Sequence, residues 1–201
     1  MSEFAAVVLA GGAARRMGGA AKPARVVAGA TLLARVLSAV ADADPRIVVG
    51  PADLQPLLAP DIIRTCEEPP GGGPIAAIAA GIARLAGTGM CALLAGDLPF
   101  LSTEVVGTLR NSLTSADAAV LVDDRGRPQW LAGVWRLASL RDRLAALGDP
   151  AGRAMRDLVA GLDVVEVAVP TTTHRPAPAW FDCDTEEDLQ RAEELAHGDI
   201  G

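Results

Sequence analysis

Short, almost continuous apolar runs alternate along the chain with segments of helical spacing. The runs are rich in Ala, Val and Leu, and several are closed by Gly or Pro, which is typical of strands buried on both faces of a sheet. They predict strands over 4–9, 46–49, 62–66, 91–95, 118–122 and 164–169.

Between most of these runs, apolar residues recur on one face of a helix. The clearest stripes are Leu32, Leu33, Val36, Leu37 and Val40 within 31–41, and Ile75, Ile78, Ile82 and Leu85 within 75–85. Further helices are expected over 137–147 and 152–160. A final helix is expected after Asp184 or Thr185, either of which can cap it, because acidic residues at 186–188 suit the positive first turn.

Alternating strands and helices need crossover connections, so the sheet should be mostly parallel with helices on both faces. The run at 129–135 follows a turn signal at 123–126 and is expected to pair antiparallel with the strand before it. The predicted fold is therefore α/β: a Rossmann-like three-layer sandwich with a mostly parallel sheet and one antiparallel strand. No repeat or linker divides residues 1–201, which we expect to form a single domain, with a mobile loop over 170–178.

The charge balance narrows the choice of ligands. With 18 basic and 25 acidic residues, the net charge of −7 argues against binding to nucleic acid, which needs a clustered basic surface. A basic island nevertheless occurs at Arg15, Arg16, Lys22 and Arg25, with no acidic residue between Phe4 and Val40. This island favours a small anionic ligand.

The cysteines and the apolar runs indicate in which cellular compartment the protein is expected. Cys66, Cys91 and Cys183 stand far apart and form neither a zinc pattern nor an even disulfide framework, which suits a reducing compartment. The first residues lack the basic segment of a signal peptide, and no apolar run approaches the roughly 20 residues that span a bilayer. We expect a cytoplasmic protein that does not bind membranes.

A glycine-rich segment at 9–22 follows the first predicted strand directly and has the chemistry of a phosphate-binding loop. Its candidate residues are Gly11, Gly12, Arg15, Arg16 and Lys22. Glycines let backbone N–H groups approach a ligand, arginines can bind phosphate with two parallel hydrogen bonds, and a lysine supplies a point charge. The alternative is a tight strand-to-helix turn beside solvated arginines.

Two better-known loops do not match this segment. The dinucleotide-binding motif needs glycines spaced as G-x-G-x-x-G and an acidic residue after the second strand, but here the glycines are adjacent and Gly50 and Pro51 follow that strand. The Walker loop needs Gly-Lys-Ser or Gly-Lys-Thr, which the chain lacks. The loop therefore belongs to a different class.

Three acidic residues near predicted strand ends are further candidates for ligand binding. Asp97 follows the buried run at 91–95, where a carboxylate can hold Mg²⁺; the alternative is that it caps a turn before Pro99. Glu67 and Glu68 precede a loop with three successive glycines, which indicates close approach to a ligand. These glutamates can accept hydrogen bonds from a base or a ribose, or they can form a plain solvated pair.

Four segments resemble the molybdenum cofactor guanylyltransferases, within the larger group of sugar-nucleotide-type nucleotidyltransferases. They are Leu-Ala-Gly-Gly-x-x-Arg-Arg-Met-Gly-Gly-x-x-Lys at 9–22, Gly-Pro-Ile-Ala-Ala at 73–77, Asp-Leu-Pro at 97–99 and Phe-Asp-Cys-Asp-Thr-Glu-Glu-Asp-Leu at 181–189. More loosely, Arg127 with Gln129 and Gly152 with Arg153 resemble the acceptor-side half of the family.

The resemblance implies transfer of guanylate from GTP to molybdopterin with release of pyrophosphate. Nucleotide-binding positions would be Leu9, Ala10 and Gly11, through backbone contacts with guanine, together with Gly12, Arg15, Lys22, Glu67, Gly73 and Asp97. The catalytic residues would be Arg16, Lys22 and Asp97. Asp97 would hold Mg²⁺, with Mn²⁺ as a possible substitute, and Asp182 or Asp184 can act as a second metal ligand or bind the pterin.

The chain also departs from the family pattern. Ala21 replaces the usual Asp before the lysine, and Gly50 or Pro51 stands where an Asn often reads the nucleotide. The alternatives are therefore a cytidylyl- or sugar-phosphate nucleotidyltransferase of the same fold, or a non-catalytic nucleotide-binding protein. Transient contact with molybdenum cofactor biosynthesis proteins or acceptor molybdoenzymes is also expected from the resemblance.

Overall fold

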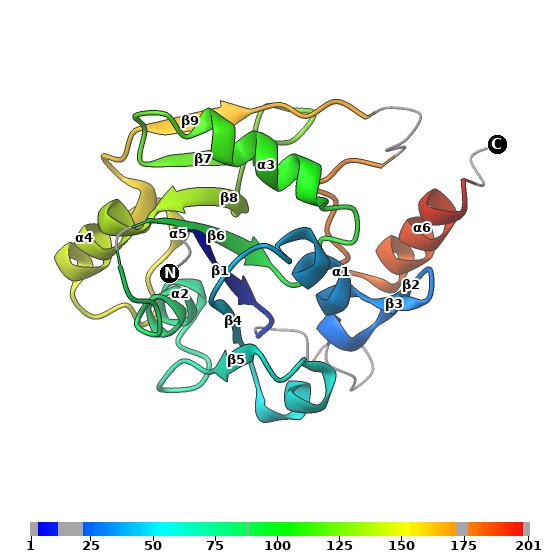
Figure 1. Cartoon of the computed structure of the whole chain (residues 1–201), viewed down its shortest axis with the longest axis horizontal. Helices are drawn as coiled ribbons and strands as arrows, with labels where there is room; N and C mark the ends of the chain where they lie inside the picture. The colour runs from blue at the N-terminus through cyan, green and yellow to red at the C-terminus, as the bar shows by residue number, and fades with distance from the viewer. Residues whose placement is uncertain (1–3, 12–21, 88, 172–176, 199–201) are drawn as a thin grey trace.

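The computed structural model describes residues 4–11, 22–87, 89–171 and 177–198. A seven-stranded sheet in the order β5-β4-β1-β6-β8-β7-β9 runs through the middle of the molecule (Figure 1). Its strands are β1 (Phe4–Leu9), β4 (Arg46–Val49), β5 (Ile62–Thr65), β6 (Met90–Ala95), β7 (Ala118–Val122), β8 (Pro128–Arg136) and β9 (Val164–Val167). Within this sheet β8 runs antiparallel to its neighbours β6 and β7, and the other pairings are parallel. The predicted mostly parallel sheet with one antiparallel strand is confirmed.

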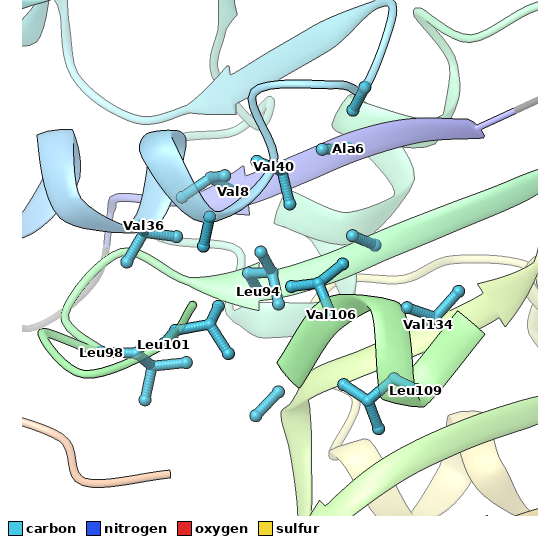
Figure 2. Close-up of a cluster of buried hydrophobic side chains, with 14 of the residues drawn as sticks. Ala6, Val8, Val36, Val40, Leu94, Leu98, Leu101, Val106, Leu109 and Val134 are labelled. Atoms are coloured by element: carbon cyan, nitrogen blue, oxygen red, sulfur yellow. The ribbon is translucent and has the colours of Figure 1, made fainter. Parts of the chain in front are cut away.

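Helices cover both faces of the sheet. On one face lie α1 (Leu32–Ala39) and α3 (Thr103–Ser112), and on the other lie α2 (Pro74–Ile82), α4 (Leu137–Leu147) and α5 (Met155–Val159). Side chains of β1 alternate between these layers: Ala6 and Val8 enter the core beneath α1 and α3 (Figure 2), and Ala5, Val7 and Leu9 enter the other. This alternation produces the predicted three layers.

Helix α2 lies unusually close to the sheet at Gly81. A Cβ at this position would lie 2.5 Å from Cγ1 of Val7 and 3.0 Å from Cγ2 of Val49, closer than van der Waals contact allows. The absence of a side chain therefore lets α2 pack directly on β1 and β4. Because α2 follows β5 directly along the chain, its first turn lies near the edge where these parallel strands end.

A smaller unit packs beside the main sandwich. It comprises a 3-10 turn η2 (Lys22–Ala24), a hairpin of β2 (Val26–Val27) and β3 (Ala30–Thr31), and helix α6 (Glu186–His197). Its core contains Val27, Leu32, Cys183, Leu189 and Ala192. Figure 1 shows α6, drawn in red, beside β2 and β3, so the two distant parts of the chain lie together.

The start of α6 decides between the two predicted caps. Thr185 Oγ1 accepts a hydrogen bond from Asp188 N at 3.1 Å, and Thr185 N donates to Asp188 Oδ2 at 2.7 Å. Thr185 is therefore the cap, in a reciprocal capping box. Asp184 is left for other contacts.

Several predicted boundaries were wrong. The helix expected over 152–160 begins only at Met155, because Gly152 has a φ of 71° and Ala154 is extended. Helix α3 was not predicted, and the strand expected over 164–169 ends at Val167. Residues 172–176 of the expected mobile loop lie outside the described residues. None of the described helices combines the length and apolar character needed to cross a membrane.

Candidate functional site

The carboxyl ends of four neighbouring parallel strands meet at one edge of the sheet. The strands β5, β4, β1 and β6 end there at Thr65, Val49, Leu9 and Ala95. Ligands of open α/β sheets bind outside such an edge. The predicted site residues that the structure describes follow these strand ends, apart from Lys22, which the next turn brings back to the same region.

The segment after β1 is fixed from both sides. Ala10 N donates to Val49 O at 2.8 Å, and Gly96 N donates to Leu9 O at 2.9 Å. A Cβ on Gly50 would lie 3.1 Å from the backbone oxygen of Ala10, and one on Gly96 would lie 3.1 Å from that of Leu9. A side chain at either position would therefore crowd this backbone.

These bonds limit how the predicted loop can bind a base. The Leu9 carbonyl and the Ala10 N–H already have partners inside the protein, whereas Gly11 is exposed at the edge of the sheet. The backbone of Gly11 is thus the most accessible part of the predicted Leu9, Ala10 and Gly11 contact. Gly12, Arg15 and Arg16 lie outside the described residues.

Lys22 lies at the centre of a charged cluster. Its Nζ is 2.5 Å from Oδ2 of Asp97, which follows β6, and 2.5 Å from Oδ1 of Asp184, which precedes α6. Lys22 is only 9% exposed, and Cys183 N donates to Asp97 O at 3.3 Å, which joins the two acidic segments. The structure therefore brings Lys22 and Asp97 together, as expected of a shared site, and adds Asp184.

The cluster alters the ionisation of its members. Desolvation lowers the pKa of Lys22, but the carboxylates of Asp97 and Asp184 raise it more, so the net shift is upward and the ammonium is charged at neutral pH. Asp182 lies beside the cluster. Desolvation raises the pKa of the Asp182 carboxyl, and the negative charges of Asp184 and Asp97 raise it further.

The donor atoms suit a hard cation. Oδ1 of Asp97 is buried and has no hydrogen-bond partner among the described residues. Because buried polar atoms are normally satisfied, this carboxylate oxygen is available to bind a cation. The described part of the chain brings no three His, Cys, Asp or Glu side chains into a metal-binding group. Mg²⁺ commonly takes only one or two protein carboxylates and completes its shell with water and substrate phosphates, so the residues present fit this ion.

Arg25 has a different role from the one its place in the basic island indicates. Its guanidinium makes two parallel hydrogen bonds to Glu186, from Nη1 to Oε1 and from Nη2 to Oε2. On the same face, Ala28 N donates to the Glu193 carboxylate at 3.0 Å. These contacts attach α6 to the segment that carries Lys22, so Arg25 helps to position that segment.

The glycine-rich loop after β5 is closed by its own glutamate. Glu67 Oε1 accepts a hydrogen bond from Gly71 N at 3.1 Å. Gly73, with φ 91° and ψ −178°, precedes Pro74 at the start of α2, a conformation that residues with a side chain rarely adopt. Glu67 and Gly73 thus lie at the same sheet edge as Asp97, but no described contact joins them to Lys22.

A pocket of about 340 Å³ lies between Asp97 and residues of β8. It is lined by Ala95, Asp97, Leu98, Pro128, Gln129, Trp130, Leu131, Ala132, Met155, Trp180 and Asp182. Gln129, from the loose acceptor-side resemblance, is among them. Arg127 is not, because its Nε donates to Asp123 Oδ2 at 2.7 Å within the turn before β8.

Comparison with known proteins identifies the family of the chain. The model of the MobA-like NTP transferase domain matches residues 6–167. The chain belongs to this family. It is 33% identical over 197 residues to the molybdenum cofactor guanylyltransferase of Bradyrhizobium sp. (strain ORS 278), covering 94% of this chain and 92% of that protein. It is 36% identical over 176 residues to a probable molybdenum cofactor guanylyltransferase of Mycobacterium avium (strain 104), with coverage of 84% and 86%.

Solved structures share the fold. The molybdopterin-guanine dinucleotide biosynthesis protein A of Archaeoglobus fulgidus matches with a TM-score of 0.69 and 23% identity, covering 96% of this chain and 98% of that chain. The 2-C-methyl-D-erythritol 4-phosphate cytidylyltransferase of Thermus thermophilus matches with a TM-score of 0.69 and 19% identity, covering 96% and 99%. At these identities the likeness concerns the fold, which enzymes acting on different substrates share.

Family membership makes the chain a nucleotidyltransferase. For this nucleotidyltransferase, sequence reasoning missed the pairing of Lys22 with Asp184 and that of Arg25 with Glu186. The acidic residues before and within the first turn of α6 were visible in the sequence, but they were assigned to helix capping, to a metal or to the pterin. No local signal connects them with residues 22–25, because more than 160 positions separate the two segments.

Proposed function

We propose that the chain transfers guanylate from GTP to molybdopterin, releasing pyrophosphate and forming the guanine dinucleotide form of the cofactor. The observation that carries this proposal is the cluster of Lys22, Asp97 and Asp184 at the ends of β1 and β6, in a chain whose relatives are named molybdenum cofactor guanylyltransferases. A buried cation beside carboxylates at this edge suits a phosphate-rich substrate bound through a metal.

The reaction needs no side-chain nucleophile. An oxygen of the terminal phosphate of molybdopterin, already ionised at neutral pH, attacks the α-phosphorus of GTP. The bond from that phosphorus to the oxygen bridging to the β-phosphate breaks, and pyrophosphate leaves with the electron pair. The protein therefore acts mainly by positioning the two substrates and neutralising their charge.

Each residue of the cluster has a role in this scheme. Lys22, held charged by its neighbours, neutralises phosphate oxygens as negative charge shifts to the leaving group. Asp97, with Asp184 or Asp182, would hold Mg²⁺, which supplies charge neutralisation and orientation of the phosphates. Arg15 and Arg16 are proposed as further phosphate ligands, and Gly11, with Leu9, Ala10 and Gly12, as the contact with the base.

Pyrophosphate release measured with Mg²⁺ and molybdopterin tests the reaction and the base together. Each of GTP, CTP, ATP and UTP is supplied in turn, and we expect release with GTP. Release with CTP alone would keep the reaction class and replace guanylate by cytidylate. Tight GTP binding without release in the presence of the acceptor would contradict the proposal and support a nucleotide sensor.

Asp97→Asn tests the metal assignment in the same assay. We expect turnover to fall by more than about a hundredfold, since a metal-binding carboxylate is lost next to the transferred phosphate. Asp142→Asn, an exposed carboxylate on α4, is the matched control and should keep parental turnover. Near-parental turnover of Asp97→Asn at saturating Mg²⁺ would refute the role of Asp97.

A further inference from the structure

Strand β8 carries a bulge at the point where β6 ends. Along β7, Val120 pairs with Gly133, but the next residue, Leu121, pairs with Gln129, so residues 130–132 have no counterpart on β7. On the other side of β8, the β6 ladder ends with Leu94 paired to Ala132. Trp130 and Leu131 therefore lie past the end of the β6 ladder and within the gap that the bulge opens in the β7 ladder. Bulges near active sites commonly redirect side chains in this way.

The redirected residues form the apolar wall of the pocket beside Asp97. Trp130 and Leu131 line it together with Leu98, Met155 and Trp180. Trp130 packs against the core beneath α2 and α4, whereas Trp180 packs against the core beneath α1 and α3. The two indole rings are half-buried, so each is anchored in a different layer and still borders the pocket.

The position of the pocket separates it from the expected nucleotide site. The glycine-rich loop follows β1, Asp97 follows β6, and Trp130 lies on β8; these strands are consecutive neighbours in the sheet. Asp97 thus lies between the end of β1 and the part of the pocket that β8 lines. A substrate in the pocket can therefore reach Asp97 with its phosphate while a nucleotide lies at the end of β1.

We infer that Trp130 and Trp180 bind the flat heteroaromatic ring of the phosphorylated acceptor and determine which acceptors the enzyme takes. The inference rests on the proposed function and adds the residues that select its second substrate. The pocket volume of about 340 Å³ suits a fused two-ring heterocycle, and indole faces stack favourably on such rings. Asp182 at the margin of the pocket can accept hydrogen bonds from ring N–H groups.

An acceptor without an aromatic ring would lose this stacking. A sugar phosphate would leave the two indoles without a flat partner, and its hydroxyl groups would meet the apolar side chains of Leu131 and Met155 instead. The structure therefore favours a ring-bearing acceptor over a sugar phosphate, through groups that take no part in the chemistry of the phosphates.

The test uses Trp130→Leu, which keeps an apolar side chain of substantial volume but removes the ring, and Trp130→Phe, which keeps a ring. Trp180→Leu is measured alongside. Leu57→Ala, on the exposed 3-10 helix η3 (Ala52–Leu57), is the control. Circular dichroism and the thermal midpoint establish that each variant is folded, and the Michaelis constants for molybdopterin and GTP are determined separately.

We expect Trp130→Leu to raise the Michaelis constant for molybdopterin at least about tenfold, the range found for loss of an aromatic stacking partner, with that for GTP unchanged. Trp130→Phe should recover most of the loss. Calorimetry with 6-hydroxymethylpterin as the probe should show binding to the parental chain and weaker binding to Trp130→Leu. A folded Trp130→Leu variant with the parental Michaelis constant for molybdopterin and the parental affinity for the pterin would overturn the inference.

The two proposals fail separately. If the parental chain binds the pterin through Trp130 but releases no pyrophosphate from any triphosphate, the ring site stands and the proposed function fails. If the parental chain uses GTP while Trp130→Leu and Trp180→Leu keep the parental Michaelis constant for molybdopterin, the proposed reaction stands and the ring site is refuted. A parental chain that neither binds the pterin nor turns over molybdopterin refutes the ring site as well as the acceptor.

Discussion

Lys22 Nζ lies 2.5 Å from a carboxylate oxygen of Asp97 and 2.5 Å from one of Asp184, so a single ammonium bridges two acids from distant parts of the chain. The side chain of Asp97 is 18% exposed and that of Asp184 is 70% exposed. Asp97 is therefore the rigid, desolvated partner, and Asp184 is the partner that can exchange Lys22 for water or another ligand.

Replacing Lys22 by Met should lower kcat/KM about a hundredfold, because a positive charge near the transferred phosphate is lost while most of the side-chain volume remains. Lys22→Arg should retain part of the activity, since it keeps the charge but changes the geometry. Steady-state pyrophosphate release measures both. If Lys22→Met stays within threefold of the parental enzyme, Lys22 has a structural role only.

Replacing Asp184 by Asn should weaken binding of a divalent cation to the protein less than replacing Asp97 by Asn does. The two carboxylates differ in exposure, and only Asp97 has a buried oxygen without a partner among the described residues. Titration with Mn²⁺ followed by electron paramagnetic resonance gives the affinities without any substrate. Glu187→Gln, an exposed acid on α6, serves as control, and equal losses for Asp184→Asn and Asp97→Asn would contradict the expected order.

Gly81→Ala should destabilise the fold by about 1–3 kcal/mol, the usual cost of overpacking a core. The added Cβ would lie 2.5 Å from Cγ1 of Val7, so shortening that side chain in Gly81→Ala/Val7→Ala should recover part of the loss. Urea unfolding of the two single variants and the double variant gives the coupling free energy. Additive effects would show that α2 relieves the contact by shifting as a whole.

Ser139→Ala should destabilise the protein at neutral pH and much less in acid. The Asp117 carboxylate accepts hydrogen bonds from Ser139 Oγ at 2.5 Å and from Asp163 N at 2.9 Å. Both bonds lower the pKa of Asp117, and the bond from Ser139 has the larger effect. A carboxyl whose pKa is lower in the folded state stabilises the fold above its unfolded value of about 3.9, and this contribution disappears as the pH falls through the folded value.

The free energy of unfolding of Ser139→Ala should therefore be about 1 kcal/mol below that of the parental chain at pH 7, and this difference should shrink below about pH 4. Denaturant unfolding across this range measures it. Asp142→Asn, an exposed carboxylate on the same helix α4 as Ser139, provides a control without this network. A difference that stays constant with pH would mean that Ser139 acts through packing alone.

Sequence reasoning succeeded where burial leaves a continuous apolar run. The strand at 4–9 is an example, since all six residues of β1 are buried and all six are apolar. It failed for α3, because only Val105, Val106 and Leu109 of its ten residues are buried, and the rest read as surface. The helix depends on packing against the sheet and on the Ser102 cap, whose Oγ accepts a hydrogen bond from Val105 N.

The site shows the same division. Lys22 and Asp97 could be selected from local patterns, because each follows a glycine-rich or buried segment of recognisable chemistry. The bulge that redirects Trp130 could not, since it arises from a mismatch in pairing between β7 and β8 and leaves no mark in the alternation of β8 itself. The roles of Arg15 and Arg16 stay predictions, as both lie outside the described residues.

The distance along the chain between Lys22 and Asp184 also concerns biosynthesis. A polypeptide emerging from the ribosome can form β1, β4, β5 and β6 from its first 97 residues, which include both Lys22 and Asp97. Asp184, the Glu186 partner of Arg25 and the pocket-lining Trp180 are made only after some 85 further residues have been translated. Nascent chains can therefore collapse around the nucleotide side early, whereas a competent enzyme exists only once its closing segment has docked.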